Sequence, residues 1–273
     1  MNVTCWVNGE ADETISAFDR GLQYGDGLFE TLEVRDGRIL LEDYHLERLS
    51  HGCECLGIAR PAPGILKKEL SRAARGETRA VLKLILTRGP ADQTYQMDPH
   101  AQPTRIVSRH PCPDYPSQWA ERGIHLCICD THVSRNARLA GLKHLNRLEQ
   151  VLARAEWTEA DDIQEGLMLD EEGSVIGGTM SNVFAWLSHG VLATPAVRLA
   201  GVAGVMRRYL LERAGKADIQ IRVASISLTE LMRAEEIFVC NSIIGVWPVA
   251  AIGHWKYSVG PVTRQAGSWA MEC

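Results

Sequence analysis

Residues 140–150 read Ala-Gly-Leu-Lys-His-Leu-Asn-Arg-Leu-Glu-Gln and place a single lysine, Lys143, among leucines. On a packed segment, Leu142, Leu145 and Leu148 would keep water away from that lysine. Loss of hydration lowers the pKa of an ammonium and frees a neutral amine, which is a nucleophile toward carbonyl groups. Taken alone, the stretch more often indicates a lysine whose stem covers apolar surface while its ammonium stays in water. The rest of the sequence decides between the two interpretations.

The composition indicates a soluble globular protein with more than one domain. The chain has 273 residues, of which 45% are hydrophobic and 23% charged, and a net charge of −5. A length of this order suits two domains of ordinary size. The negative charge argues against nucleic acid or an anionic membrane surface as a partner. No apolar stretch is long enough to span a bilayer and no signal peptide is apparent, so we expect a cytoplasmic protein.

The cysteines do not indicate a disulfide framework or a metal site. There are eight in the chain, and a cytosolic protein keeps its thiols reduced. Cys127, Cys129 and His132 invite a zinc interpretation, but residues 124–129 read as a strand in which alternate side chains share a face. The two cysteines are then small buried side chains, and no second pair of ligands is well spaced. We expect no bound metal.

Hydrophobic periodicity predicts a mixed α and β chain with no internal repeat. Helices are expected at residues 42–58, 61–75, 145–158 and 204–214. Strands are expected at residues 5–8, 32–34, 39–41, 80–87, 105–108, 124–129, 166–169, 182–186, 191–194, 219–223, 236–240 and 245–251.

A proline-rich stretch divides the chain. Residues 110–116 read His-Pro-Cys-Pro-Asp-Tyr-Pro, and prolines at this density stop both helix and sheet. We therefore expect a smaller N-terminal domain at 1–110, a linker at 111–118 and a larger C-terminal domain at 119–273 that carries Lys143.

Three features suggest an anion site. Gly201-Val202-Ala203-Gly204 precedes a helix, whose first backbone N–H groups and dipole attract negative charge. An ordinary junction between a loop and a helix is the other interpretation, and the glycine spacing is not that of a P-loop. Asn241-Ser242 follows a strand, and Arg48 offers a guanidinium that suits phosphate.

These segments together resemble the fold-type IV pyridoxal-phosphate family, which contains branched-chain aminotransferases, D-amino acid aminotransferases and aminodeoxychorismate lyases. The resemblance spans nearly the whole chain, and the matching segments occur in the family's order. They are Asp19-Arg20-Gly21, Tyr24-Gly25-Asp26-Gly27-Leu28-Phe29-Glu30-Thr31, His45-Leu46-Glu47-Arg48-Leu49, Leu86-Thr87-Arg88-Gly89, Gly141-Leu142-Lys143-His144-Leu145-Asn146, Thr179-Met180-Ser181-Asn182-Val183-Phe184, Gly204-Val205-Met206-Arg207 and Cys240-Asn241-Ser242.

The resemblance implies an α+β fold of two domains and a homodimer. It also implies that Lys143 carries pyridoxal phosphate as a Schiff base. Arg48, the amides of Val205 and Met206, and the Asn241-Ser242 pair would then hold the cofactor's phosphate.

Within the family, residues 139–150 are most similar to the lysine segment of the aminodeoxychorismate lyases. This likeness implies that the chain removes pyruvate from 4-amino-4-deoxychorismate and releases 4-aminobenzoate, with Lys143 as the general base. Arg88 or Arg105 is expected to bind a substrate carboxylate. Three further side chains are expected to line the pocket, namely Tyr24, Phe29 and Thr31.

One position departs from the family pattern. The family carries a glutamate five residues before the Asn of Asn-x-Phe, where it pairs with the pyridine nitrogen, and this chain has Gly177 there. Either Glu171 or Glu172 replaces that acid, or the elimination tolerates a weaker electron sink because the product ring becomes aromatic, or the chain is impaired. The second explanation is our hypothesis. A D-amino acid or branched-chain aminotransferase and a non-catalytic ligand-binding relative are the alternative functions.

Overall fold

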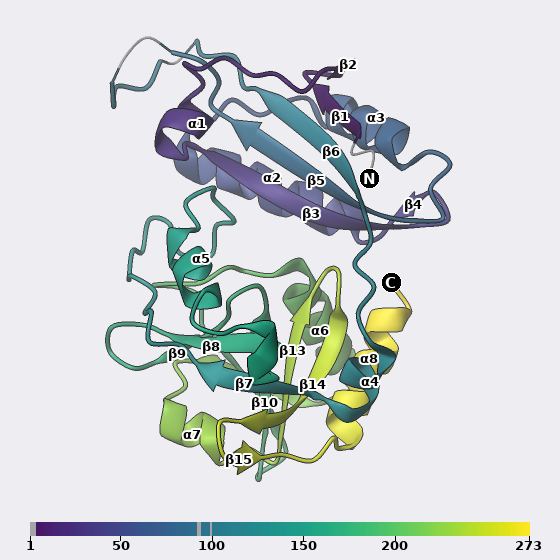
Figure 1. Cartoon of the computed structure of the whole chain (residues 1–273), viewed down its shortest axis with the longest axis vertical. Helices are drawn as coiled ribbons and strands as arrows, with labels where there is room; N and C mark the ends of the chain where they lie inside the picture. The colour runs from purple at the N-terminus through teal and green to yellow at the C-terminus, as the bar shows by residue number, and fades with distance from the viewer. Residues whose placement is uncertain (1–3, 92–93, 99) are drawn as a thin grey trace. The chain divides into compact units, whose positions relative to one another are not determined.

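The structure is a computed structural model that describes residues 4–91, 94–98 and 100–273. The chain forms two compact units, one of Met1–Pro113 with Leu142–Asn146 and one of Asp114–Gly141 with Arg147–Cys273. Each unit is a sheet with helices packed on it, which confirms the α+β class (Figure 1). Among the described residues, no helix combines the length and the apolar character that crossing a membrane requires.

The first unit contains a six-stranded antiparallel sheet in the order β2-β1-β6-β5-β3-β4. The strands are β1 (Thr4–Val7), β2 (Glu10–Ala11), β3 (Gly27–Arg35), β4 (Arg38–Ile39), β5 (Arg79–Thr87) and β6 (Arg105–Pro111). The helices are α1 (Arg20–Tyr24), α2 (Glu42–Leu56) and α3 (Pro63–Ala74).

Helices α2 and α3 lie on one face of this sheet (Figure 1). Leu28 and Leu32 of β3 point to that face, where they meet Leu49 of α2 and Leu70 of α3 in one buried cluster. Alternate β3 residues must then point to the opposite face, because side chains alternate along a strand. Phe29 is therefore on the face that the helices do not cover.

The second unit contains a nine-stranded mixed sheet in the order β12-β11-β10-β13-β14-β7-β8-β9, with β15 paired to β14. The strands are β7 (Ile124–Ile128), β8 (Glu165–Leu169), β9 (Val175–Gly178), β10 (Asn182–Leu187), β11 (Val191–Pro195), β12 (Gln220–Ala224), β13 (Glu236–Asn241), β14 (Gly245–Ile252) and β15 (Trp255–Lys256). The helices are α4 (Ser117–Arg122), α5 (Leu148–Arg154), the 3-10 helix η1 (Glu159–Asp161), α6 (Val205–Lys216), α7 (Leu228–Met232) and α8 (Pro261–Met271).

The lysine segment differs from the sequence expectation. Residues 145–158 were expected to be one helix, but α5 begins only at Leu148. Residues 142–146 form no helix, His144 makes an isolated antiparallel bridge with Leu28, and the segment groups with the first unit. Backbone hydrogen bonds to β3 hold this segment, and an extended backbone can form them where a helix cannot.

Candidate functional site

Lys143 is held against β3 by the backbone. Phe29 N donates to Lys143 O at 2.9 Å, and Leu145 N donates to Gly27 O at 3.0 Å. The Lys143 side chain is half-buried, and its amine lies 4.3 Å from the centroid of the Phe29 ring. An ammonium or amine against an aromatic face has lost part of its water, which is the environment that the leucine-rich sequence indicated.

Phe29 and Thr31, both expected to line the pocket, point to the same face of β3, and Phe29 meets Lys143 there. Thr31 pairs in register with Lys83 of β5. The Lys83 amine lies 5.6 Å from the centroid of the same Phe29 ring. The sequence analysis missed Lys83, although its place in an alternating strand was the available signal.

The opposite face of β3 carries a buried acid, Glu30. His45 Nδ1 lies 2.6 Å from Glu30 Oε2, and Arg48 donates from Nε to Oε1 at 2.8 Å and from Nη2 to Oε2. Burial opposes ionisation of Glu30, but the Arg48 charge and the hydrogen bonds from Arg48 and His45 outweigh it and lower the pKa of Glu30 to about 2. Glu30 is therefore a carboxylate at neutral pH.

His45 is the neutral member of this cluster. Burial lowers the pKa of His45 first, and the nearby charges of Arg48 and Lys143 lower it further, against the opposing effect of Glu30. Its Nε2 is buried with no hydrogen-bond partner in the described part of the chain. The Nδ1 atom therefore carries the proton and donates to Glu30.

Arg48 was expected to hold the cofactor's phosphate. Its paired contact with the Glu30 carboxylate fixes the plane and direction of the guanidinium, because a bidentate contact leaves little rotational freedom. The structure thus makes Glu30 the group that orients Arg48.

In the second unit, α6 begins immediately after Gly204, as the glycine motif predicted. The first amides of a helix, here those of Val205 and Met206, have no acceptor within the helix and are suited to bind an anion. A Cβ at residue 204 would collide with Asn182 Oδ1. Asn182 Nδ2 in turn donates to Val202 O at 2.9 Å, so Asn182 fixes the loop that precedes the helix.

Asn182 also brings Asn241 close to the start of α6. Asn182 pairs in register with Cys240, the residue before Asn241. The Asn241 side chain stabilises its own turn, since Oδ1 accepts from Ile243 N at 2.8 Å and Ile244 N at 2.9 Å and Nδ2 donates to Met180 O at 3.2 Å. The hydroxyl of Ser242 is therefore the side-chain group of this pair that suits a phosphate.

Gly177 lies in β9, where the neighbouring backbone leaves little room for a side chain. A Cβ there would lie 2.8 Å from the carbonyl oxygen of Ser181, which accepts a hydrogen bond from Gly178 N. Of the two acids proposed as replacements, Glu171 and Glu172 are both exposed, and Glu172 pairs with Arg135. The structure therefore does not favour either as a substitute.

The buried acid nearest to this turn is Glu165, which the sequence analysis did not single out. Its carboxylate accepts from Thr179 N at 2.9 Å, Thr179 Oγ1 at 2.5 Å and Ser181 Oγ at 2.7 Å. A Cβ at Gly178 would lie 2.5 Å from Glu165 Oε2. Glu165 shapes the turn from 179 to 181, and these hydrogen bonds occupy its carboxylate.

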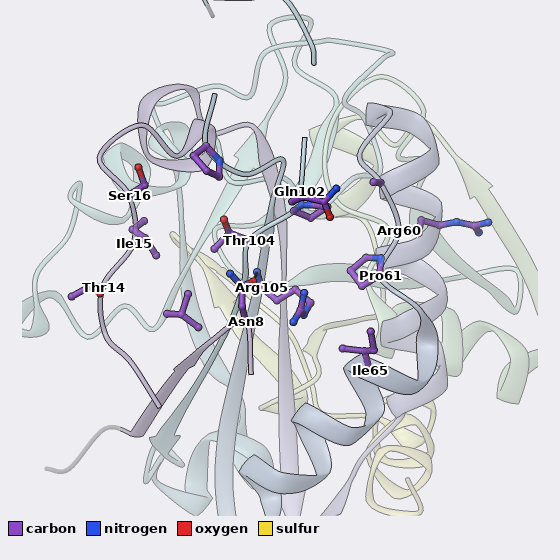
Figure 2. Close-up of a pocket in the computed structure, with 14 residues that line it drawn as sticks. Asn8, Thr14, Ile15, Ser16, Arg60, Pro61, Ile65, Gln102, Thr104 and Arg105 are labelled. Carbon is purple, nitrogen blue, oxygen red and sulfur yellow. Dashed lines mark hydrogen bonds between the residues drawn. The ribbon is translucent and has the colours of Figure 1, made fainter. Parts of the chain in front are cut away.

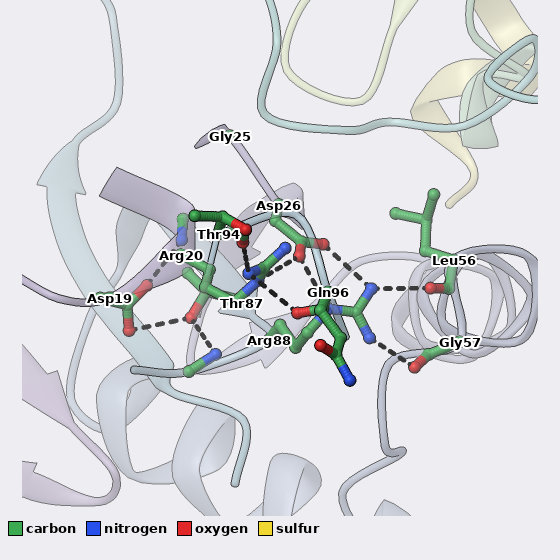
Figure 3. A network of polar contacts seen from close by, with 12 residues as sticks. Asp19, Arg20, Gly25, Asp26, Leu56, Gly57, Thr87, Arg88, Thr94 and Gln96 are labelled. Carbon is green, nitrogen blue, oxygen red and sulfur yellow. Dashed lines mark hydrogen bonds and ion pairs between the residues drawn. The ribbon is translucent and has the colours of Figure 1, made fainter. Parts of the chain in front are cut away.

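Arg88, one of the two arginines expected to bind a substrate carboxylate, is instead part of a buried network (Figure 3). It donates to Asp26 Oδ2 at 2.7 Å and Oδ1 at 3.1 Å, and to the carbonyls of Gly57 at 2.6 Å and Leu56 at 2.8 Å. Arg20 binds the same Asp26 at 2.9 Å. With four of its N–H groups occupied and its side chain buried, Arg88 joins β5 to the end of α2 and is not retained as a substrate ligand.

Arg105 and Tyr24 also have structural partners. Arg105 donates to Glu69 of α3 at 2.9 Å from Nη2. The Tyr24 ring lies 5.5 Å from that of Tyr95, at an interplanar angle of 53°. Arg105 thus lies on the helix-covered face of the sheet, opposite to Phe29.

Known proteins are similar to this chain over most of its length. The profile of the class IV aminotransferases matches residues 27–252. The chain is 34% identical to an aminodeoxychorismate lyase of Vibrio harveyi, covering 95% of this chain and 97% of that one.

Two solved structures are similar over nearly their whole length. A 4-amino-4-deoxychorismate lyase from Pseudomonas aeruginosa has a TM-score of 0.94 and 44% identity, covering 98% of each chain. A PLP-bound hypothetical aminotransferase from Mycobacterium tuberculosis has a TM-score of 0.85 and 19% identity, covering 98% of this chain and 97% of that one, and shows likeness of fold.

Proposed function

Because the chain belongs to the class IV aminotransferase family, we propose that it is a pyridoxal-phosphate enzyme that eliminates pyruvate from 4-amino-4-deoxychorismate and releases 4-aminobenzoate. The observation that carries the proposal is the half-buried Lys143 amine, held by two backbone hydrogen bonds against the Phe29 ring. The two lyases to which the chain is similar along its whole length support this reaction over amino transfer.

The residues present fit pyridoxal phosphate. Lys143 offers the amine for the aldehyde, and Arg48, Val205 and Met206 offer a guanidinium and two amides for the phosphate. The glycine at 204 keeps the start of α6 open where a Cβ would collide with Asn182. Bound pyridoxal phosphate supplies an electron sink that makes the proton on the amine-bearing carbon acidic.

Lys143 is the group that moves that proton. Its neutral amine removes the proton from the carbon that bears the substrate amine, and the neighbouring C–O bond to the enolpyruvyl group breaks. The ring becomes aromatic, and the released enol becomes pyruvate. The Phe29 ring covers one side of the amine and limits the approach of water to it.

Lys83 is the cation that we propose for a substrate carboxylate. It shares the Phe29 face with Lys143, whereas Arg88 is bound to Asp26 and Arg105 to Glu69. An ammonium on a flexible stem suits a carboxylate whose position changes during the reaction.

We also propose that the protein is a cytoplasmic homodimer. The thiol state of all eight cysteines is suited to a reducing compartment. Exposed apolar side chains around α1, which include Phe18 and Leu22, offer a surface for a second copy.

The direct test supplies the purified protein with pyridoxal phosphate and 4-amino-4-deoxychorismate and follows release of 4-aminobenzoate. We expect release that is lost in Lys143→Ala and kept in Lys67→Ala, a control that removes an exposed lysine paired with Asp43. Amino transfer to an added keto acid without pyruvate release would favour an aminotransferase. Cofactor binding with neither reaction would favour the non-catalytic alternative.

A further inference from the structure

A cavity of about 590 Å³ opens in the first unit, on the side of the sheet that carries α3 (Figure 2). Its walls come from the end of β1, residues 14–16, the connection between α2 and α3, and residues 102–105. Lys143, Phe29 and Arg48 are not part of the lining, so this cavity is separate from the lysine site. Its volume is in the range of cavities that bind small molecules.

The lining combines two cations with apolar walls. Arg60 and Arg105 are both among the 14 described residues that line the cavity, none of which is acidic, and the Arg60 guanidinium is directed toward α2, where it pairs with Glu54 (Figure 2). Ile15, Pro61 and Ile65 contribute apolar surface. A ligand that matches both features carries a negative charge on a small apolar body.

The arginines and one amide retain donors for such a ligand. Arg105 uses Nε and Nη2 for Glu69, and Nη1 has no partner in the described part of the chain. Asn8 Oδ1 accepts from Arg105 N at 3.0 Å, which points its amide group toward the same place and leaves Nδ2 as a donor.

Arg60 is held on α2 by two exposed contacts, a hydrogen bond to Ser50 Oγ at 3.0 Å and an ion pair with Glu54. Its pair with Glu54 has an N–O distance of 2.7 Å, but both side chains are more than half exposed. An exposed ion pair contributes little in water, about 0–1 kcal/mol, so Arg60 can turn to a bound anion at small cost. Once Arg60 has turned, its guanidinium would add a planar, bidentate donor that suits a carboxylate.

We propose that this cavity is a second binding site for a small aromatic carboxylate. A negative charge on an apolar body follows from the lining, and an aromatic ring is the apolar body that we propose. The ligand's identification with the aromatic product of the reaction, which would then act on the enzyme that makes it, rests on the proposed function.

The test uses benzoate as the probe and the protein loaded with its cofactor. Binding is measured by titration calorimetry and by ligand-observed NMR for the wild type, Arg60→Gln and Ala59→Trp. Ala59 is an exposed lining residue, so a tryptophan there fills the cavity without disturbing the core. The matched control is Arg208→Gln, which removes an exposed Arg–Glu pair in the second unit.

We expect the benzoate affinity to fall at least about tenfold in Arg60→Gln, because a charge-assisted hydrogen bond is lost, and to fall in Ala59→Trp, but to be unchanged in Arg208→Gln. Unchanged affinity in Arg60→Gln overturns the proposal, whether or not Ala59→Trp folds. Displacement of benzoate by an equal concentration of inorganic phosphate would contradict the aromatic class. Benzoate binding is read without turnover, so its failure is distinct from a failure of the lyase assay.

Discussion

Glu30 is a buried acid of the first unit whose ionisation depends on its partners. It is completely buried, and its carboxylate joins β3 to α2 through His45 and Arg48. Loss of its charge would leave the Arg48 guanidinium without its acid in a poorly hydrated place, which costs several kcal/mol in comparable cases. Stability should therefore depend on the protonation of this one group.

Glu30→Gln should lower the free energy of unfolding at pH 7 by about 3 kcal/mol, the equivalent of a pKa lowered from 4.5 to about 2. The carboxylate's contribution is complete above about pH 4.5 and is lost as the pH falls toward 2. The difference between the wild type and the variant should therefore narrow across that window in urea unfolding curves. Glu54→Gln, at an exposed pair, is the control and should change little. A constant difference from pH 7 to pH 2 would contradict the assignment.

Substitutions of Lys83 and of Arg88 should have different effects, one on substrate binding and the other on stability. Lys83→Gln should raise KM about tenfold or more with a smaller change in kcat, since a charge-assisted contact to the substrate is lost. Arg88→Lys should instead lower Tm, because lysine cannot reproduce the fork that joins Asp26 to two carbonyls. Steady-state kinetics and thermal unfolding of both variants separate the two roles. An unchanged KM in Lys83→Gln would show that a residue other than Lys83 binds the substrate carboxylate.

At the scale of elements, the agreement with the sequence depends on whether packing is local. The strand at residues 80–87 was predicted almost as found, because β5 alternates regularly and lies inside its sheet. The expected strand at residues 32–34 is in fact β3 from Gly27 to Arg35. Glu30 interrupts its apolar pattern, and only its buried pairing with α2 explains an acid at that position.

The lysine segment is an element whose structure the sequence predicted wrongly. Hydrophobic periodicity predicted a helix from residue 145, but backbone hydrogen bonds to β3, more than 100 residues earlier, hold residues 142–146 outside the helix, which begins at Leu148. Periodicity describes the chain's local preference and contains no information about such a distant partner. The same limit hid Asn182, which the motif contained but whose contact with the loop at Val202 depends on the fold.

Gly177, next to the turn between β9 and β10, allows a direct test of the hypothesis that the elimination tolerates a weaker electron sink. Gly177→Glu should raise lyase turnover by less than tenfold, because aromatisation already drives loss of the proton. Its Cβ must also displace Ser181 O, 2.8 Å away. Gly177→Ala is the matched control, since it adds the same Cβ without the acid, and both should lower Tm by several degrees. Turnover that rises by orders of magnitude in Gly177→Glu but not in Gly177→Ala would show that the missing acid limits the reaction.

For the whole molecule, the sequence shows residue types more readily than their partners. The glycine-led helix and Arg48 were recognised as residue types suited to phosphate, and their binding of one cofactor phosphate stays a prediction from the resemblance. Arg88 and Arg105 had the right charge for a substrate carboxylate, but charge alone does not reveal that Asp26 and Glu69 occupy them. Which acid meets which arginine is a property of the assembled sheet and helices.

The exposed apolar side chains of the first unit bear on its assembly. Leu22 of α1 is 64% exposed and Tyr95 is 83% exposed, and Phe18 and Met97 are also exposed. The contact between the Tyr24 and Tyr95 rings places α1 beside residues 94–97, so these side chains form one patch. A patch of this kind is suited to a protein–protein interface, and the homodimer that we propose would bury it against a second copy.

If the protein is the homodimer that we propose, the double variant Leu22→Glu/Tyr95→Glu should be a monomer, because charges on the patch would be buried unpaired in the interface. Light scattering after size-exclusion chromatography measures the mass directly. Trp255→Glu is the control, an equally polar change at an exposed aromatic residue of β15 in the second unit, and should leave the mass unchanged. A dimer that persists in the double variant at micromolar concentration would place the interface elsewhere on the chain.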